Sequence, residues 1–298
     1  MRESPRTTLL FKPDAAHTVR VSYNRAYRAP SLVNNFLDTT LINQLDLGAL
    51  NPALAGRVYN FPVQAVGNES LTEESLDAYE LGYSGVIANR ATVSAAFYVN
   101  DSKASILFTQ NGSYRATNPP PGWPLPPAAL ELIYLSGRFG PGNGLPSSFT
   151  YENFGKVRQK GIELGVDTDI TAPLTAFVNY SYQPTPEPSG FDISELNLPP
   201  HHRFNIGANY TGPRVIGNLS VNHTSDAYWQ DVLDSRYHGY TNAYTLVNGT
   251  FGYRLTDDFS ASLKIVNLFD KEIQQHVFGD VMRRQVVLEL RMRVGTKP

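Results

Sequence analysis

The fold is decided by two stretches near the end of the chain, Phe259-Ser260-Ala261-Ser262-Leu263-Lys264-Ile265 and Gln285-Val286-Val287-Leu288-Glu289-Leu290-Arg291-Met292-Arg293-Val294. Successive side chains of a β-strand point to opposite faces, so every second residue shares a face. In the second stretch one face is wholly apolar, and the other is charged apart from Gln285 and Val287. Both stretches therefore predict strands of a hairpin with one apolar side, which must lie against a protein core or against lipid.

The same alternation recurs along most of the chain and predicts about eleven strands. The connections between them follow a pattern, because short turns near 12–17, 88–91, 171–173, 211–214 and 255–258 alternate with longer loops near 28–72, 111–148, 184–199, 230–239 and 270–281. In a sheet whose every second connection is tight, one end carries short turns and the other end carries long loops, as in outer-membrane barrels. The first long loop is expected to be irregular with short helical pieces. The second is expected to hold a helix between Pro127 and Phe139, because Pro suits a helix start and good helix formers follow it.

The polar faces of these strands separate a membrane barrel from a soluble fold. They carry Ser, Asn, Glu and Arg, which suit a wet or plugged lumen and would not line a soluble core. Tyrosines near the predicted strand ends would supply interfacial girdles; they are Tyr23, Tyr27, Tyr180, Tyr182, Tyr210, Tyr240, Tyr244 and Tyr253. A soluble β-sandwich or β-helix is the alternative, but long strands with strictly alternating connections fit a sandwich poorly.

We therefore expect an all-β fold, an antiparallel up-and-down transmembrane β-barrel. In the last strand, this predicts an outward face of Val286, Leu288, Leu290 and Met292. The inward face is expected to carry Glu289, Arg291 and Arg293. An arginine on the lipid side at mid-strand would contradict a membrane barrel, since Arg there costs roughly 2–4 kcal/mol.

Composition narrows the classes of function. The 298 residues carry a formal charge of -2, which points neither to nucleic acid nor to an anionic membrane surface. The chain has no cysteine, so it has neither a disulfide framework nor thiolate chemistry. The first stretch, Met1-Arg2-Glu3-Ser4-Pro5-Arg6-Thr7-Thr8, lacks the zones of a secretory signal. For a protein outside the cytoplasm we expect an N-terminally truncated chain, and a cytosolic start is the alternative.

Several motifs resemble those of one known family. Arg25-Ala26-Tyr27-Arg28-Ala29-Pro30-Ser31 resembles an Arg-Ala-Phe-Arg-Ala-Pro-Ser segment found where a strand enters a loop. Asn153-Phe154-Gly155 with Gly161-Ile162-Glu163 is similar to a further strand entry, and the strongest match is Val266-Asn267-Leu268-Phe269-Asp270-Lys271. Weaker matches are Asn68-Glu69-Ser70-Leu71-Thr72-Glu73-Glu74, Pro200-His201-His202-Arg203-Phe204-Asn205, Gly279 and Arg284. In this order, over about residues 4–294, they resemble the β-barrel domain of TonB-dependent outer-membrane receptors.

The resemblance implies a 22-stranded barrel with an N-terminal plug, which imports scarce ligands with energy from the inner-membrane TonB complex. Residues 1–298 would form roughly the second half of that barrel, without the plug, the TonB box or the signal peptide. The location would be the outer membrane of a Gram-negative bacterium. The partners would be outer-membrane lipid, an extracellular small ligand and TonB, the last through the missing N-terminal region. The usual terminal aromatic residue of the family is absent from the last eight residues.

Candidate ligand-binding residues lie in the long loops that the pattern places on the external side. Aromatic side chains there could stack on a sugar, siderophore or corrin ligand, although membrane-interface anchoring explains those at strand ends equally well. Histidines could help hold a metal-chelate ligand, and arginines could contact an anionic ligand or lipopolysaccharide phosphates, or form salt bridges in the lumen. The candidates are Trp123, Tyr134, Tyr228, Trp229, Tyr237, Tyr240, His238, His276, Arg283 and Arg284.

The sequence holds no arrangement typical of catalysis, so we predict that the protein is not an enzyme. It lacks a Gly-x-Ser-x-Gly elbow, a phosphate-binding Gly loop and a His-Glu-x-x-His pair. We also predict no cofactor and no structural metal. The leading hypothesis is a receptor that takes up a siderophore-iron complex, cobalamin or a carbohydrate. A passive diffusion channel of the porin type is the alternative.

Overall fold

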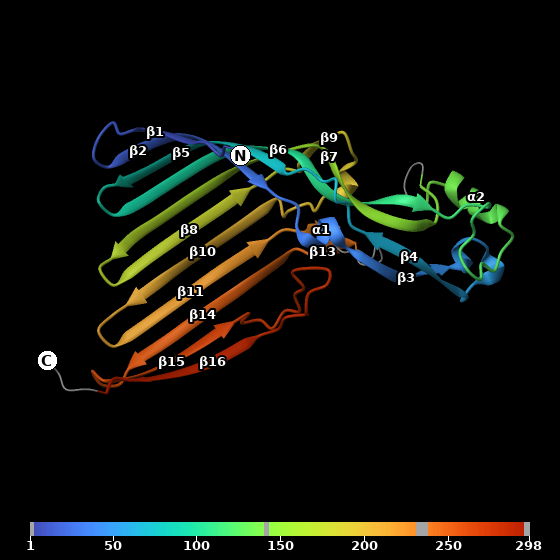
Figure 1. Ribbon diagram of the computed structural model, residues 1–298. Coiled ribbons are helices and arrows are strands. Elements are labelled where there is room, and N and C mark those ends of the chain that lie inside the picture. The colour runs from blue at the N-terminus through green and yellow to red at the C-terminus, as the bar shows by residue number, and fades with distance from the viewer. Residues whose placement is uncertain (1–2, 140–142, 231–237, 295–298) are drawn as a thin grey trace.

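The computed structural model describes residues 3–139, 143–230 and 238–294 and consists mainly of one antiparallel sheet (Figure 1). Within these residues the sheet has 14 strands, and eleven of them follow one another in the order β1-β2-β5-β6-β7-β8-β10-β11-β14-β15-β16. Strands β1 and β16 are the two ends of this order and do not pair with each other. The predicted up-and-down architecture with about eleven strands is thus confirmed, as an open sheet that forms half of a barrel.

The eleven strands of this path are β1 (Arg6–Phe11), β2 (His17–Arg28), β5 (Glu74–Ile87), β6 (Ala91–Ser113), β7 (Pro146–Thr171), β8 (Leu174–Tyr182), β10 (His202–Thr211), β11 (Val215–Thr224), β14 (Tyr244–Arg254), β15 (Phe259–Val266) and β16 (Gln285–Met292). The other elements lie in the long connections and are α1 (Leu32–Phe36), β3 (Asp38–Asp46), η1 (Leu47–Ala49), η2 (Pro52–Leu54), β4 (Val58–Val66), α2 (Ala128–Leu135), β9 (Glu187–Ser189), η3 (Ile193–Glu195), β12 (Ala227–Trp229) and β13 (Gly239–Thr241). In the described residues, none of the helices has the length and apolar character needed to cross a membrane.

The connections alternate as the sequence predicts. Tight turns join β1 to β2, β5 to β6, β7 to β8, β10 to β11 and β14 to β15 at one end of the sheet. The long connections emerge at the opposite end, which we call the long-loop end (Figure 1). One turn, at Ala88 and Asn89, uses two residues with φ of 53° and 52°. This left-handed conformation matches the two-residue turns that suit the twist of paired strands.

The two faces of the sheet differ in chemistry along its whole width. On one face, Val21, Leu81, Phe97 and Ile162 are register partners across β2, β5, β6 and β7. Following the register onward places Val286, Leu288, Leu290 and Met292 of β16 on this same apolar face. Glu289 and Arg291 fall on the opposite face, as predicted.

The opposite face is polar and lines a cavity of about 740 Å³, where Arg20, Glu163 and Ser181 lie in one register row. We call it the lumen face. Glycine and alanine separate the larger side chains in this row, since Gly82 and Ala96 lie between Arg20 and Glu163. Polar side chains of mixed charge that alternate with small residues form a polar, water-accessible surface, as expected inside a barrel.

The first two long connections form a compact unit, which we call the loop arm: residues 38–66 together with 105–150 (Figure 1). Here the structure differs from the expected irregular loop, because β3 and β4 pair over nine residues each. Strand β4 also runs parallel to the start of β7, and β6 and β7 extend together into the arm. The predicted helix is present as α2. The arm therefore has regular structure that its own sequence pattern does not reveal.

A hydrophobic core holds the loop arm together. Its buried members come from β3, η1, β4, α2 and the segment before β7, and they are Leu45, Leu47, Phe61, Val63, Leu130, Ile133 and Leu145. A latch on the surface adds to this core: Glu131 of α2 accepts from Arg115 Nε at 3.1 Å and from the Ala116 amide at 3.1 Å. The Arg115 guanidinium lies 3.7 Å from the centre of the Tyr134 ring. These contacts hold α2 against the start of its loop.

Two of the sequence motifs have clear structural roles. Asn267 is 3% exposed with φ of 59°, a conformation that Asn tolerates better than most residues. Its side chain accepts from the Lys271 amide at 3.0 Å and donates to the Lys271 carbonyl at 2.7 Å, which closes the turn after β15. At Gly155, a Cβ would lie 1.8 Å from the Ser189 carbonyl oxygen, so only glycine lets β9 pair with β7 there. Both motifs shape loops.

Candidate functional site

The long-loop end brings together four of the predicted residues, Tyr228, Trp229, Tyr240 and His276, which we call the mouth cluster. The small hairpin of β12 and β13 pairs Tyr228 with Tyr240, and their ring centres lie 5.1 Å apart. The Trp229 ring meets the His276 ring edge-on at 4.5 Å, although these residues belong to different loops. Tyr240 is 65% exposed, so the cluster offers aromatic surface to solvent.

Backbone and polar contacts hold the mouth cluster in place. The Tyr228 amide donates to the Leu198 carbonyl at 3.0 Å, and the Leu198 amide donates back at 2.9 Å. Trp229 Nε1 donates to Thr241 Oγ1 at 3.1 Å across the hairpin. On the far side, Gln275 Nε2 donates to the Tyr244 hydroxyl at 3.0 Å. Three loops thus meet at these aromatic rings.

A carboxylate that the sequence analysis did not single out lies beside the mouth cluster. Glu195 of η3 accepts from Gln230 Nε2 at 3.3 Å, and the Gln230 amide donates to Asn197 Oδ1 at 2.6 Å. Burial raises the pKa of Glu195 above its usual range, and the charge of His238 opposes this in part. No local sequence signal marks Glu195, because its partners lie more than thirty residues further along the chain.

Arg283 and Arg284 lie just before β16, at the long-loop end of the last hairpin, which the sequence predicts to be external. Arg283 forms ion pairs with Asp270, at 3.4 Å, and with Glu272. The Arg284 amide donates to Asp270 Oδ1 at 2.9 Å, and a guanidinium nitrogen of Arg284 contacts the Leu268 carbonyl at 3.5 Å. Arg283 is therefore largely neutralised by its partners. The Arg284 guanidinium makes no hydrogen bond to a carboxylate among the described contacts, and its charge helps to lower the pKa of Asp270.

Two further aromatic candidates, Trp123 and Tyr134, lie elsewhere, in the loop arm. Trp123 packs edge-on against Tyr59 at 5.2 Å and borders the core of the arm. The ring of Tyr134 lies against Arg115, as described above. Both rings have structural partners here and are separate from the mouth cluster. Tyr237 lies outside the described residues. His238 is the first described residue after it, and its charge lowers the pKa of Glu195.

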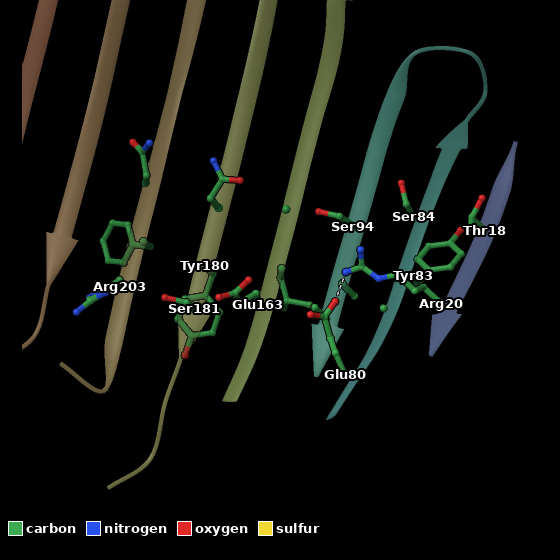
Figure 2. A pocket seen from close by; sticks show the side chains of 18 of the residues that line it. Thr18, Arg20, Glu80, Tyr83, Ser84, Ser94, Glu163, Tyr180, Ser181 and Arg203 are labelled. Atoms are coloured by element: carbon green, nitrogen blue, oxygen red, sulfur yellow. Dashed lines mark hydrogen bonds and ion pairs between the residues drawn. The ribbon is translucent and has the colours of Figure 1, made fainter. Parts of the chain in front are cut away.

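The lumen face, unlike the mouth cluster, carries paired charges. Figure 2 shows the guanidinium of Arg20 and the carboxylate of Glu80 pointing toward one another from neighbouring strands, and the two form an ion pair. Glu163, Ser181 and Arg203 continue this polar wall across β7, β8 and β10. Among the described residues, no group of three His, Cys, Asp or Glu side chains is arranged to hold a metal ion.

Comparison with known proteins places this geometry in context. The chain is 27% identical over 137 residues to the catecholate siderophore receptor Fiu of Escherichia coli (strain K12), which covers 41% of the chain and 17% of that receptor. Its fold is similar to a variant of the ferric enterobactin receptor PfeA from Pseudomonas aeruginosa, with 16% identity and a TM-score of 0.64 over 97% of the chain and 40% of that structure. The siderophore receptor PirA from Acinetobacter baumannii gives 16% identity and a TM-score of 0.65, with the same coverage.

The chain thus spans less than half the length of these relatives, and the structural likeness shows the shared fold. The family profile described as TonB dependent receptor-like, beta-barrel, matches residues 2–268, which is most of the chain. This match agrees with the open sheet, the alternating connections and the polar lumen face. The chain belongs to the TonB-dependent receptor-like β-barrel family.

Proposed function

We propose that this chain forms part of the barrel of an outer-membrane receptor for an iron-siderophore complex, with a catecholate as the favoured ligand class. The observation that carries the proposal is the mouth cluster, which presents aromatic rings at the long-loop end. The connection between β15 and β16 that supplies His276 to this cluster also carries Arg284. A ferric catecholate complex offers flat aromatic rings and a net negative charge. Aromatic stacking and charge-assisted hydrogen bonds are the interactions that such a ligand would form.

Residues of the mouth cluster suit the first contact with such a ligand. Tyr240 is exposed. Trp229 of the same hairpin and His276 of the connection between β15 and β16 form a second aromatic surface. Arg284 lies just before β16, and its guanidinium makes no hydrogen bond to a carboxylate among the described contacts. The similarity to siderophore receptors named for catecholate and enterobactin ligands supports this ligand class over cobalamin or a carbohydrate.

The proposed mechanism of transport follows from the barrel. The polar lumen face would line the ligand's route, and its paired charges, such as Arg20 with Glu80, leave few strong sites where an anion would remain bound. Energy would come from TonB through a region N-terminal to this chain in the relatives. A passive channel of the porin type shares the polar lumen but needs no energy source, and this difference separates the two functions.

Uptake of iron tests the function. The complete protein that contains this chain is expressed in a strain without its own catecholate receptors, and uptake of radioactive iron bound to a catecholate siderophore is measured. We expect uptake that disappears when TonB is deleted. Uptake that continues without TonB would favour the diffusion channel, and no uptake above the empty vector would contradict the proposed ligand class.

A pair of aromatic variants tests the site. Tyr240 and Phe11 are both 65% exposed, but they lie at opposite ends of the sheet. Tyr240→Ala should weaken binding of the ferric catecholate several-fold, corresponding to a lost aromatic contact of about 1 kcal/mol. Phe11→Ala should leave binding unchanged. Equal affinities of the two variants, measured by quenching of intrinsic fluorescence, would remove the mouth cluster from the proposed site.

A further inference from the structure

A band of charged residues crosses the outer, apolar face of the sheet near its long-loop end, and we call it the charge belt. Register pairs Arg25 with Asp77, Asp77 with Asp101, and Asp101 with Arg158 across β2, β5, β6 and β7. Strand β9 extends this row, because Glu187 pairs with Arg158. Adjacent rows on the same face add three lysines. The full belt consists of Arg25, Lys103, Lys156, Arg158, Lys160, Asp77, Asp101 and Glu187.

The belt begins directly beyond the apolar band. The row next to it holds Tyr23 and Tyr79, whose rings lie 5.2 Å apart, and the following row holds Val21, Leu81 and Phe97. Two residues along a strand span about 7 Å. The charged row therefore lies about 7 Å from the row of the aromatic pair. Aromatic side chains of this kind mark the boundary between hydrocarbon and headgroups in membrane proteins. The belt therefore lies at headgroup level.

Ion pairs inside the belt place the carboxylates beneath the cations. Asp77 accepts from Lys103 Nζ at 2.9 Å and from the Tyr23 hydroxyl at 2.8 Å, and Arg25 Nε lies 3.3 Å away. Asp101 accepts two hydrogen bonds from Arg158, at 2.7 and 2.9 Å. The Asp77 side chain is 9% exposed, whereas that of Arg158 is 56% exposed. The exposed surface of the charge belt is thus more positive than the count of its charges alone suggests.

Five cations face three carboxylates in the belt, and the carboxylate side chains of Asp77 and Asp101 are only 9% and 26% exposed. Lys156 is exposed and shares a register row with Lys103, so its ammonium group adds to the positive surface. The lumen face is the opposite face of the sheet, so a ligand transported through the lumen does not pass here. Lysines and arginines clustered at a membrane surface typically bind anionic lipid, at about 1 kcal/mol for each cation.

We propose that the charge belt binds the phosphate groups of lipopolysaccharide in the outer leaflet. The proposal rests on the outer-membrane location proposed above, which puts the long-loop end outside. Lipopolysaccharide is favoured over a phospholipid because its lipid A part is bisphosphorylated and can contact several cations of one belt. The buried Asp77 and the partly buried Asp101 orient the cations, and the exposed ends of Lys103, Arg158 and Lys160 are left to reach the phosphates.

The test compares lipids bound by the complete protein after extraction in detergent, using native mass spectrometry. The probes are bisphosphorylated lipid A and the same lipid A after removal of its phosphates. We expect the protein to retain the bisphosphorylated lipid about tenfold better. Equal retention of the two lipids by the unmodified protein would overturn the proposal, and this comparison needs no variant.

A matched pair of triple variants places the site on the belt. Lys103, Lys156 and Lys160 are changed to Gln in one variant; in the control the exposed lysines Lys12, Lys264 and Lys271 are changed to Gln. The belt variant should lose about a hundredfold in retention of bisphosphorylated lipid A, whereas the control should keep it. Replacing the three belt lysines by Arg should preserve binding. A belt variant that retains the lipid as well as the control would contradict the proposal.

Binding of the ferric catecholate is measured in the same samples. A belt variant that loses lipid A but still binds the catecholate supports the belt proposal independently of the ligand assignment. If the unmodified protein binds lipid A with phosphate selectivity but no catecholate, the proposed ligand fails and the belt stands. Folding of each variant is checked by the shift of its electrophoretic mobility on heating.

Discussion

The loop arm buries its apolar side chains, whereas the path of eleven strands from β1 to β16, which we call the barrel wall, exposes side chains of the same types. In the arm, Leu130 and Leu145 are fully buried and Phe61 is 2% exposed. In the wall, Leu81 is 52% exposed, Phe251 59% and Leu288 67%. Both regions are regular and well paired, so the difference does not lie in their secondary structure.

This contrast shows what each region requires from its surroundings. Burying a leucine stabilises a protein by about 1.5–3 kcal/mol, and the arm gains this energy from its own core. The wall gains less of it from the protein, since apolar side chains such as Leu81 and Leu288 remain more than half exposed within the described residues. A face of this size exposed to water would be unfavourable, whereas lipid accommodates it. The arm is built for water and the wall for a bilayer.

The largest effect is expected in the core of the arm. Leu130→Ala should lower the free energy of unfolding of the arm by about 2–5 kcal/mol, because it leaves a cavity in a fully packed site. Leu132→Ala is the control on the same helix, where the side chain is 68% exposed and little should change. Hydrogen exchange of the α2 amides measures both variants. Similar protection in the two would show that the arm has no core of its own.

A charge on the wall should have a slightly smaller effect. Leu81→Arg places a guanidinium on the apolar face, between the short turn after Ile87 and the charge belt, and should cost roughly 2–4 kcal/mol in a bilayer. Leu132→Arg in the arm makes the same chemical change in water and should cost less than about 0.5 kcal/mol. Urea unfolding of the complete protein in lipid vesicles gives the difference. If both variants unfold alike, the wall does not face hydrocarbon.

The smallest effect concerns the latch of the arm at low pH. Hydrogen bonds from Arg115 and the Ala116 amide hold the pKa of Glu131 below its ordinary value of 4.5. Stability from this latch is therefore present above that value and is lost as the pH falls through the lowered pKa. With Trp229 replaced by Phe, Trp123 is the chain's single tryptophan and reports on the arm. Its emission should shift on acidification, and Glu131→Gln should abolish this dependence; an unchanged shift would exclude the latch.

The wall could be predicted from the sequence because each of its residues meets one of two solvents, lipid or the wet lumen. Apolar and polar residues alternate along a single strand, as from Val286 to Met292, and this alternation shows which face each residue occupies. The short turns then indicate which strands pair. The β3–β4 hairpin could not be predicted in the same way. Its apolar residues Phe61 and Val63 pack on Leu130 and Leu145, which lie in another connection, so no local period reveals the partner.

The candidate site was predictable in part for a similar reason. Aromatic residues in long loops could be selected from the sequence, and Tyr228 and Tyr240 are brought together by one hairpin. The contact of Trp229 with His276, and the position of Glu195 beside Gln230, depend on how three loops fold over one another. The sequence gives no sign that Trp123 packs on Tyr59, because the two residues lie in different loops.

The central claim, that the apolar face of the sheet contacts lipid, is tested most directly along β5 and β6. The chain has no cysteine, so single cysteines can be placed at successive positions and labelled with a fluorophore. In vesicles of brominated lipid, labels at Leu81 and Phe97 should be quenched, and labels at Glu80 and Ser94 should not. Quenching that alternates in this phase is the predicted result. Equal quenching at all four positions, or the reverse phase, would contradict the account.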